Sequence, residues 1–265
     1  METSLLTILI FIFGLAIGSF LNVIILRLPK EKTLTGRSAC PRCKKVLGTL
    51  ELVPVFSFLF LGGKCKNCKQ PISWRYPLIE FLTGLCFLLA WLNFEPVALP
   101  EWIVFAQVLF LIAFGVAVFV IDLENYLILD NLVWPAMVVF LVLNFAYDLA
   151  LPGNGFARTV NGLLAALFSA LPFYLIWFFS KGKAMGFGDV KLMLPLGLSL
   201  GWPLVGVGLF VAVVSGGVLG VILMALGKKG LKSPLPFGCF LIVGALVAVF
   251  YGSDLVSWYL SFLGL

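Results

Sequence analysis

Histidine is absent from this chain of 265 residues. Its absence excludes Ser-His-Asp triads, histidine general bases and every metal site that needs an imidazole ligand. Charge is also scarce, because Asp, Glu, Lys and Arg make up only 11% of the residues. Apolar residues make up 62%, whereas a soluble domain is only about half apolar. The composition therefore excludes an ordinary soluble domain and predicts a multi-pass protein in a lipid bilayer.

Eight apolar segments carry that prediction. They are Leu5–Leu26, Leu78–Phe94, Trp102–Ile121, Leu132–Tyr147, Thr159–Phe179, Val190–Leu200, Leu204–Leu226 and Phe237–Phe262. We expect no removable signal peptide, because the first segment is long enough to span and its basic residues follow it. The sixth segment is shorter than the ~20 residues that a full crossing needs. It could be a partial helix that lines a cavity.

Basic residues are concentrated in the loop after the first segment. From Arg27 to Arg75 the loop holds eleven Lys and Arg residues, opposed only by Glu31 and Glu51. The positive-inside rule places this loop in the cytoplasm, where it can touch anionic lipid headgroups. Because the net charge of +6 is confined to certain loops, we expect no nucleic-acid partner.

The alternation of eight spans extends this asymmetry to the rest of the chain. It puts five further lysines on the cytoplasmic side, namely Lys181, Lys183, Lys228, Lys229 and Lys232. Asp148 and Arg158 then fall in outer loops. The charge distribution thus supports the predicted topology.

Two C-x-x-C motifs lie in the cytoplasmic loop, Cys40 with Cys43 and Cys65 with Cys68. About two dozen residues separate them, near the spacing of a Cys₄ zinc ribbon. Disulfides and a redox motif are the alternatives, but a reducing cytoplasm disfavours structural disulfides. With four thiolate ligands the site would be closed, so a bound Zn²⁺ would be structural and would hold a small loop folded.

Asp122 and Asp189 stand at the edges of long apolar segments. A carboxylate at membrane depth is costly, so its default interpretation is functional. Each also has an ordinary alternative, a solvated helix end for Asp122 and a helix N-cap for Asp189. Gly186 and Gly188 precede Asp189, and without side chains they let another chain approach the carboxylate closely. For Asp130, capping of the following segment is the favoured interpretation.

Two carboxyl groups that meet can act as an aspartic protease. One must be ionised and its partner neutral, a condition that close proximity enforces. The ionised carboxylate takes a proton from water, and the neutral partner polarises the scissile carbonyl. Asp122 and Asp189 are therefore the predicted catalytic residues.

A series of short motifs runs along the chain. In order they are Gly18–Ile24 with Arg27-Leu28-Pro29, the paired C-x-x-C motifs, Ile72–Glu80, Ile121-Asp122 with Asp130, Gly186–Leu192 and Pro236-Phe237-Gly238. This series, which covers nearly the whole chain, resembles that of the type IV prepilin peptidases. Two departures occur: Ile128-Leu129-Asp130 replaces a family Leu-Pro-Asp or Ile-Pro-Asp, and Cys239 stands where proline is common.

The resemblance implies an all-helical GxGD-type aspartyl protease fold with about eight transmembrane helices and a small zinc-ribbon-like insert. It implies three parts: a first transmembrane helix over 1–26, a Cys₄ loop over 27–77 and a protease core over 78–265. Asp122 and Asp189 match the catalytic pair, and Gly186, Gly188 and Lys191 are expected to support the catalytic loop. Location in the bacterial inner membrane is implied too, with the cysteine loop and active site on the cytoplasmic side.

The implied substrates are prepilins and pseudopilins, cut after a Gly between a basic leader and an apolar helix. The new N-terminal residue, usually Phe, would then be methylated from S-adenosylmethionine. Glu80 is the candidate for methyl transfer or substrate binding, against the alternative of a solvated helix end. No glycine-rich Rossmann fingerprint marks the S-adenosylmethionine site, so a peptidase without methyl transfer stays open.

Two rival functions come from other classes. A transporter or channel with a regulatory zinc ribbon would use a broken helix and intramembrane acids to bind ions. It predicts further charges deep within several spans, whereas most charges here lie at one interface. A non-enzymatic assembly factor would leave Asp122, Asp189 and their glycines unexplained.

Overall fold

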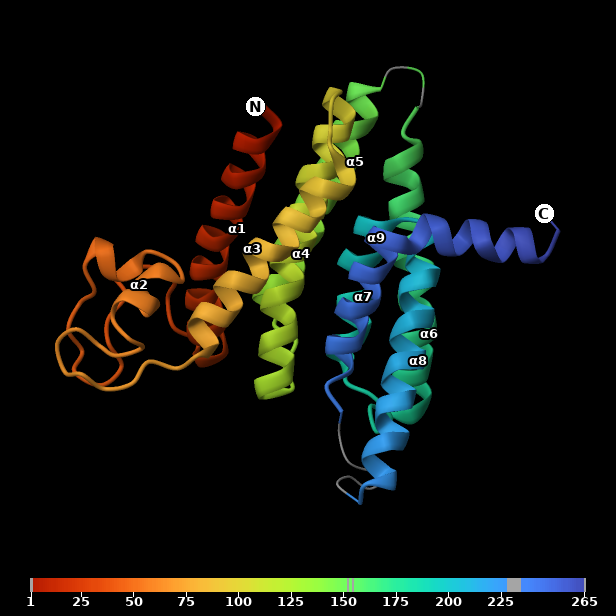
Figure 1. Ribbon diagram of the computed structural model, residues 1–265. Helices are drawn as coiled ribbons and strands as arrows, with labels where there is room; N and C mark the ends of the chain where they lie inside the picture. Colours follow the sequence, from red (N-terminus) through yellow and green to blue (C-terminus); the bar gives the residue numbers. More distant parts are fainter. Residues whose placement is uncertain (1, 152, 154, 228–234, 265) are drawn as a thin grey trace. The chain divides into compact units, whose positions relative to one another are not determined.

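The computed structural model describes residues 2–151, 153, 155–227 and 235–264, and within these ranges it is helical (Figure 1). Lys228, Lys229 and Lys232 lie outside the described residues. The long helices are α1 (Glu2–Arg27), α3 (Arg75–Phe94), α4 (Leu99–Asn125), α5 (Asp130–Ala150), α6 (Ala157–Ser180), α7 (Phe187–Leu200), α8 (Leu204–Ala225) and α9 (Phe237–Phe262). The chain divides into two compact units, residues 1–95 and 96–265, which we describe separately as unit 1 and unit 2.

In unit 1, α1 packs against α3 through glycines. A Cβ on Gly14 would lie 2.7 Å from the Cα of Gly84, and one on Gly18 would lie 2.7 Å from the Cα of Glu80. Small residues four apart allow this close approach, as is common between helices in membranes. The contact fixes Glu80 at the end of α3 that follows the loop.

The loop between α1 and α3 contains three short helical turns: η1 (Leu28–Lys30), η2 (Thr49–Leu52) and α2 (Phe56–Phe60). Arg27, at the end of α1, gathers the loop around its guanidinium group. That group donates hydrogen bonds to the carbonyls of Thr33, Leu34 and Thr35 over 2.8–3.3 Å. The fork of donors on one arginine thus folds the start of the loop back onto the helix end.

Seven helices of the described chain are long and apolar enough to cross a membrane, and they match seven of the eight predicted segments. The chain is therefore a multi-pass membrane protein. The remaining segment forms α7, a helix of 14 residues, as its length led us to expect. This short helix contacts α4, α5, α6, α8 and α9, so it lies at the centre of unit 2 (Figure 1). Its side chains Leu192, Met193 and Leu196 are all at most 2% exposed.

Small residues also bring the helices of unit 2 together. A Cβ on Gly197 of α7 would lie 2.4 Å from the Cα of Ala166 on α6. A Cβ on Gly244 of α9 would lie 2.1 Å from the carbonyl oxygen of Gly208 on α8. These contacts leave no space for a side chain, so α7 packs directly on α6 and α9 packs directly on α8.

Candidate active site and metal centre

Three helix ends of unit 2 converge on Asp122 and Asp189. Asp122 lies in the last turn of α4 and is only 4% exposed. Its Oδ2 accepts a hydrogen bond of 3.1 Å from the backbone N–H of Cys239, in the first turn of α9. The N-terminus of a helix carries unpaired N–H groups and partial positive charge, so α9 is well placed to bind a carboxylate.

Asp189 approaches Asp122 from the first turn of α7. The two carboxyl groups are close enough for their charges to interact. The N-cap of α7 is Gly186 and no side chain caps the helix, so the capping alternative for Asp189 is wrong. No hydrogen bond engages the Asp189 carboxylate among the residues that the structure describes. The two predicted catalytic residues are thus neighbours, and one of them retains unused hydrogen-bonding capacity.

Ile128 fills the space beside the two carboxylates. A Cβ on Gly188 would lie 3.0 Å from the Cβ of Ile128. On the other side, a Cβ on Gly238 would lie 3.1 Å from Cδ1 of Ile128 and 2.8 Å from Oδ2 of Asp122. Gly188 therefore serves close packing, and Gly238 is required for the carboxylate to fit.

Lys191 forms an ion pair with Asp130, and its ammonium also lies 5.6 Å from the centroid of the Phe187 ring. The favoured interpretation of Asp130 as a helix cap is wrong, because Leu129 is the N-cap of α5 and Asp130 is the first residue of the helix. Its carboxylate instead ties the start of α5 to the first turn of α7. Lys191 thus connects α7, the helix that carries Asp189, to α5.

A second polar cluster lies at the opposite end of α7 and was missed in the sequence. The side-chain amides of Asn144 and Gln107 donate to the carbonyls of Leu198 and Ser199, each over 2.8 Å. Those carbonyls belong to the last turn of α7, where the helix has no N–H donors of its own to offer them.

Arg158 completes this cluster. Its guanidinium donates to Oδ1 of Asn144 and Oε1 of Gln107, each over 3.2 Å, and lies 4.5 Å from the centroid of the Tyr147 ring. Asp148 accepts from the backbone N–H groups of Arg158 and Thr159. Asp148 and Arg158 belong to α5 and α6, so their placement in outer loops is corrected.

The four predicted metal ligands meet in unit 1. The sulfurs of Cys40, Cys43, Cys65 and Cys68 all lie within 4.8 Å of one another, and those of Cys40 and Cys68 are 3.9 Å apart. Tetrahedral Zn²⁺ with Zn–S bonds of ~2.3 Å would place its sulfurs ~3.8 Å apart. None of the cysteines forms a disulfide. The arrangement therefore fits one tetrahedral ion.

Both C-x-x-C motifs adopt the same turn. Cys40 N–H donates to the carbonyl of Lys45, and Cys65 N–H donates to that of Gln70, five residues on in each case. The residue after the second cysteine, Lys44 or Lys69, has a φ of 59° or 56°. This left-handed residue reverses the chain, so that backbone N–H groups face the sulfurs.

Those N–H groups stabilise thiolates, the form of cysteine that binds a metal cation. The backbone amide of Lys45 and the side chain of Asn67 lower the pKa of Cys43 to about 6. The Gln70 amide also favours the Cys68 thiolate, but burial and the neighbouring sulfurs raise the pKa of Cys68 to about 11. Because metal ligation requires thiolates, a divalent cation would offset this repulsion.

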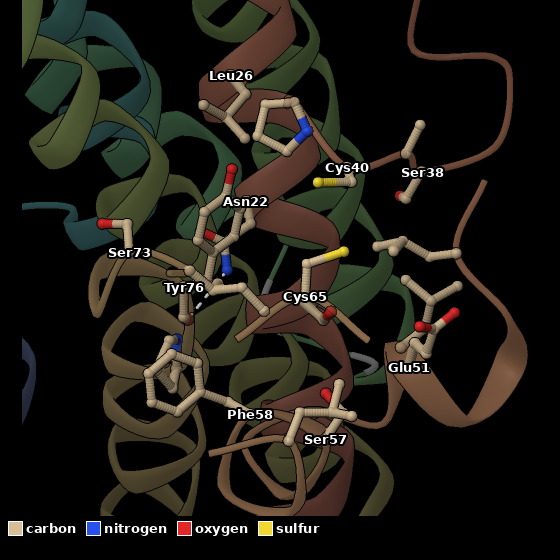
Figure 2. A pocket seen from close by; sticks show the side chains of 18 of the residues that line it. Asn22, Leu26, Ser38, Cys40, Glu51, Ser57, Phe58, Cys65, Ser73 and Tyr76 are labelled. Carbon is tan, nitrogen blue, oxygen red and sulfur yellow. Dashed lines mark hydrogen bonds between the residues drawn. The ribbon is translucent and has the colours of Figure 1, made fainter. Parts of the chain in front are cut away.

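Glu80 is buried, so the alternative of a solvated helix end is wrong. Only 9% of the residue is exposed, and Oε2 accepts a hydrogen bond of 2.7 Å from the backbone N–H of Val55. It lies in the wall of a cavity inside unit 1, shown from close by in Figure 2.

Comparisons with known proteins agree with the division into two units. The Bacterial Peptidase A24 N-terminal domain model matches residues 12–94, and the Type IV leader peptidase family model matches residues 109–221. No solved structure matches the chain significantly.

Relatives from several bacteria carry the name Prepilin leader peptidase/N-methyltransferase. The one from Pseudomonas aeruginosa is 33% identical over 284 residues, covering 96% of this chain and 93% of that protein. The one from Bacillus subtilis is 32% identical over 255 residues, covering 96% and 97%. The one from Aeromonas salmonicida is 32% identical over 283 residues, covering 96% and 93%.

Proposed function

The chain belongs to the type IV leader peptidase family, and on that premise we propose that it is a bifunctional prepilin-processing enzyme. Its first reaction removes the basic leader of type IV prepilins or pseudopilins after a Gly. Its second methylates the new N-terminal amine. The observation that carries the proposal is the meeting of Asp122 and Asp189 at three helix ends.

The catalytic roles follow from proton balance at the two carboxyls. One carboxylate of the Asp122–Asp189 pair accepts a proton from water, and the resulting hydroxide attacks the scissile carbonyl carbon. The protonated partner donates to the carbonyl oxygen. When the tetrahedral intermediate collapses, the C–N bond breaks and the leaving amine takes a proton from the pair. The amine of the mature protein is the product that the second reaction needs.

S-adenosylmethionine is the proposed methyl donor, because the relatives are named N-methyltransferases. When bound, it supplies an electrophilic methyl group for the new amine. Residues 1–95 contain the buried carboxylate of Glu80 beside a cavity, which is the proposed place for this chemistry.

We propose that the cysteine loop and the aspartate pair both face the cytoplasm, in the bacterial inner membrane. Eleven basic residues between Arg27 and Arg75 support this orientation of the loop. In unit 2, Lys181 and Lys183 lie in the segment just before α7, at the end that carries Asp189. A basic leader would remain on this side while its apolar helix stays in the bilayer.

Mass spectrometry of a co-expressed prepilin tests the function directly. With wild-type enzyme we expect loss of the leader and one added methyl on the mature N-terminus. Asp122→Asn and Asp189→Asn should leave the leader attached. Cleavage without methylation would reduce the function to a peptidase, and cleavage by both variants would overturn the aspartic mechanism.

We propose Zn²⁺ as the ion held by the four cysteines, in a structural role. Because all four cysteines must be thiolates to hold the ion, protons compete with the metal increasingly as the pH falls. Zinc content measured after dialysis should therefore stay near one ion per chain at pH 7 and fall at pH 5. Cys43→Ser should lose zinc at pH 7, and a variant that keeps it would contradict the assignment.

A further inference from the structure

Unit 1 encloses a cavity of about 420 Å³ between the loop and the adjoining ends of α1 and α3. Figure 2 shows Asn22 of α1, Phe58 of α2 and Tyr76 of α3 around it, with Cys40 and Cys65 at another wall. Its volume falls within the ~300–1,000 Å³ of small-molecule and cofactor sites. The cavity therefore has the size of a binding site and lies against the metal cluster.

Asn22 contributes an unused acceptor to this cavity. The residue is 3% exposed, and its Nδ2 donates a hydrogen bond of 3.1 Å to the carbonyl of Tyr76. That bond fixes which side of the amide is oxygen, and Oδ1 has no partner in the described residues. A buried acceptor without a partner costs free energy, so a ligand N–H or O–H would be its natural partner.

Arg27, Arg42 and Lys66 line the same cavity and can face an anionic group, whereas Glu80 contributes a carboxylate. Its carboxylate is held by the backbone N–H of Val55 and by the side chain of Ser19, and no lysine or arginine of the described chain pairs with it. A buried carboxylate of this kind favours a cationic ligand group, such as a sulfonium or an ammonium. Phe58 and Tyr76 add aromatic surface, against which a flat heterocycle can pack.

We propose that this cavity is the S-adenosylmethionine site, with Glu80 facing the sulfonium of the cofactor and Asn22 accepting a hydrogen bond from it. The inference rests on the proposed methyl transfer and locates it in unit 1. It requires no glycine-rich phosphate-binding turn, since the cofactor carries no phosphate. Because Cys40 and Cys65 line the same cavity, metal binding shapes the wall that the cofactor contacts.

Binding of two related ligands to the zinc-loaded, detergent-purified protein distinguishes the effect of the Glu80 charge from the effect of cavity shape. Radiolabelled S-adenosylmethionine and neutral S-adenosylhomocysteine are compared by equilibrium dialysis. Glu80→Gln should weaken binding of the sulfonium by about tenfold or more and that of the neutral thioether by less than about threefold. An equal loss for both ligands, or no loss, would overturn the role of Glu80.

Glu101→Gln is the matched control. Glu101 of unit 2 also accepts a backbone N–H over 2.7 Å, from Val97, but does not line the cavity. Both affinities should stay within about twofold of wild type for this variant. Ser57→Phe, which adds a ring to the cavity wall, should abolish binding of both ligands, and retained binding would contradict the location.

Photo-crosslinking of wild type gives a readout that needs no variant. Radiolabelled S-adenosylmethionine should label peptides within residues 19–80, and label confined to unit 2 would overturn the inference. An enzyme that methylates prepilin but crosslinks elsewhere would refute only this location. An enzyme that cleaves prepilin without ever methylating it would refute the proposed methyl transfer itself.

Discussion

The two ends of α7 carry two polar clusters of opposite character. At the C-terminal end, Asn144, Gln107 and Arg158 bond to one another and to the helix carbonyls. At the N-terminal end, Asp122 has one hydrogen bond from Cys239, and Asp189 has none among the described residues. Buried polar groups stabilise a fold when they are fully bonded, whereas unused capacity is available to a substrate. The C-terminal cluster therefore has the bonding of a structural cluster, whereas the N-terminal cluster has the unused capacity expected of the reactive end that we propose.

The largest expected effect is a loss of cleavage without a loss of stability at the reactive end. Asp189→Asn should lower the cleavage rate by at least about a hundredfold, because it removes a proton-transfer group. Thermal unfolding in detergent should shift upward or stay unchanged, because a neutral amide removes the cost of burying a second carboxyl group beside Asp122.

Asp148→Asn is the matched control at the structural end. It makes the same chemical change to a carboxylate that accepts from Arg158 and Thr159. We expect it to lower the unfolding temperature while the remaining folded enzyme still cleaves. If Asp189→Asn destabilises the protein and Asp148→Asn does not, the two ends have been assigned the wrong way round.

A stability effect should dominate at Arg158. Arg158→Met removes the donors that bind Asn144 and Gln107, which leaves two buried amide oxygens unpaired. The free energy of unfolding should fall by about 1–3 kcal/mol. Arg158→Lys should restore only part of this loss, because one ammonium cannot reproduce the fork geometry. Unfolding in mixed micelles measures both, and equal stability of all three proteins would contradict the structural role.

Gly238→Ala tests whether the Asp122 carboxylate needs its present position against the backbone of α9. The added Cβ would lie 2.8 Å from Oδ2 of Asp122, so the carboxylate must shift from its present position. Because small displacements of reacting groups are costly, we expect cleavage to fall about tenfold or more.

Gly217→Ala is the control for that substitution, because no atom lies within 4 Å of the added Cβ on α8. Its cleavage rate should equal that of wild type. A rate unchanged in Gly238→Ala as well would show that Asp122 does not need its present position.

The same comparison explains what could be predicted from the sequence. Seven long spans, the short α7 and the two C-x-x-C motifs have local signatures, namely apolar length and fixed spacing. The meeting of Asp122 with Asp189 was predicted from their cost in a membrane and from the motif series.

What could not be predicted depends on contacts between residues far apart in the chain. The Cys239 N–H that binds Asp122 is 117 residues away, and a backbone donor leaves no mark on residue type. Gln107 and Ser199 are 92 residues apart. Polar residues near helix ends look like loop residues in a sequence, so Asp148 and Arg158 were assigned to loops. The shortness of the α7 segment did point to this cluster. The last carbonyls of a short, buried helix need hydrogen-bond donors from other helices.

The smallest expected effect concerns the ion pair between Lys191 and Asp130. This pair is neither fully buried and bonded, like the cluster around Arg158, nor left without a partner, like Asp189. Their side chains are 18% and 55% exposed, so the pair should contribute less than about 1 kcal/mol. We expect Lys191→Gln and Asp130→Asn each to lower the cleavage rate by less than about fivefold. The double variant should cleave as fast as either single variant, because all three proteins lack the same interaction. Cleavage rates of the four proteins form a double-mutant cycle. Additive losses would mean that Lys191 contacts the substrate rather than holding α7 against α5.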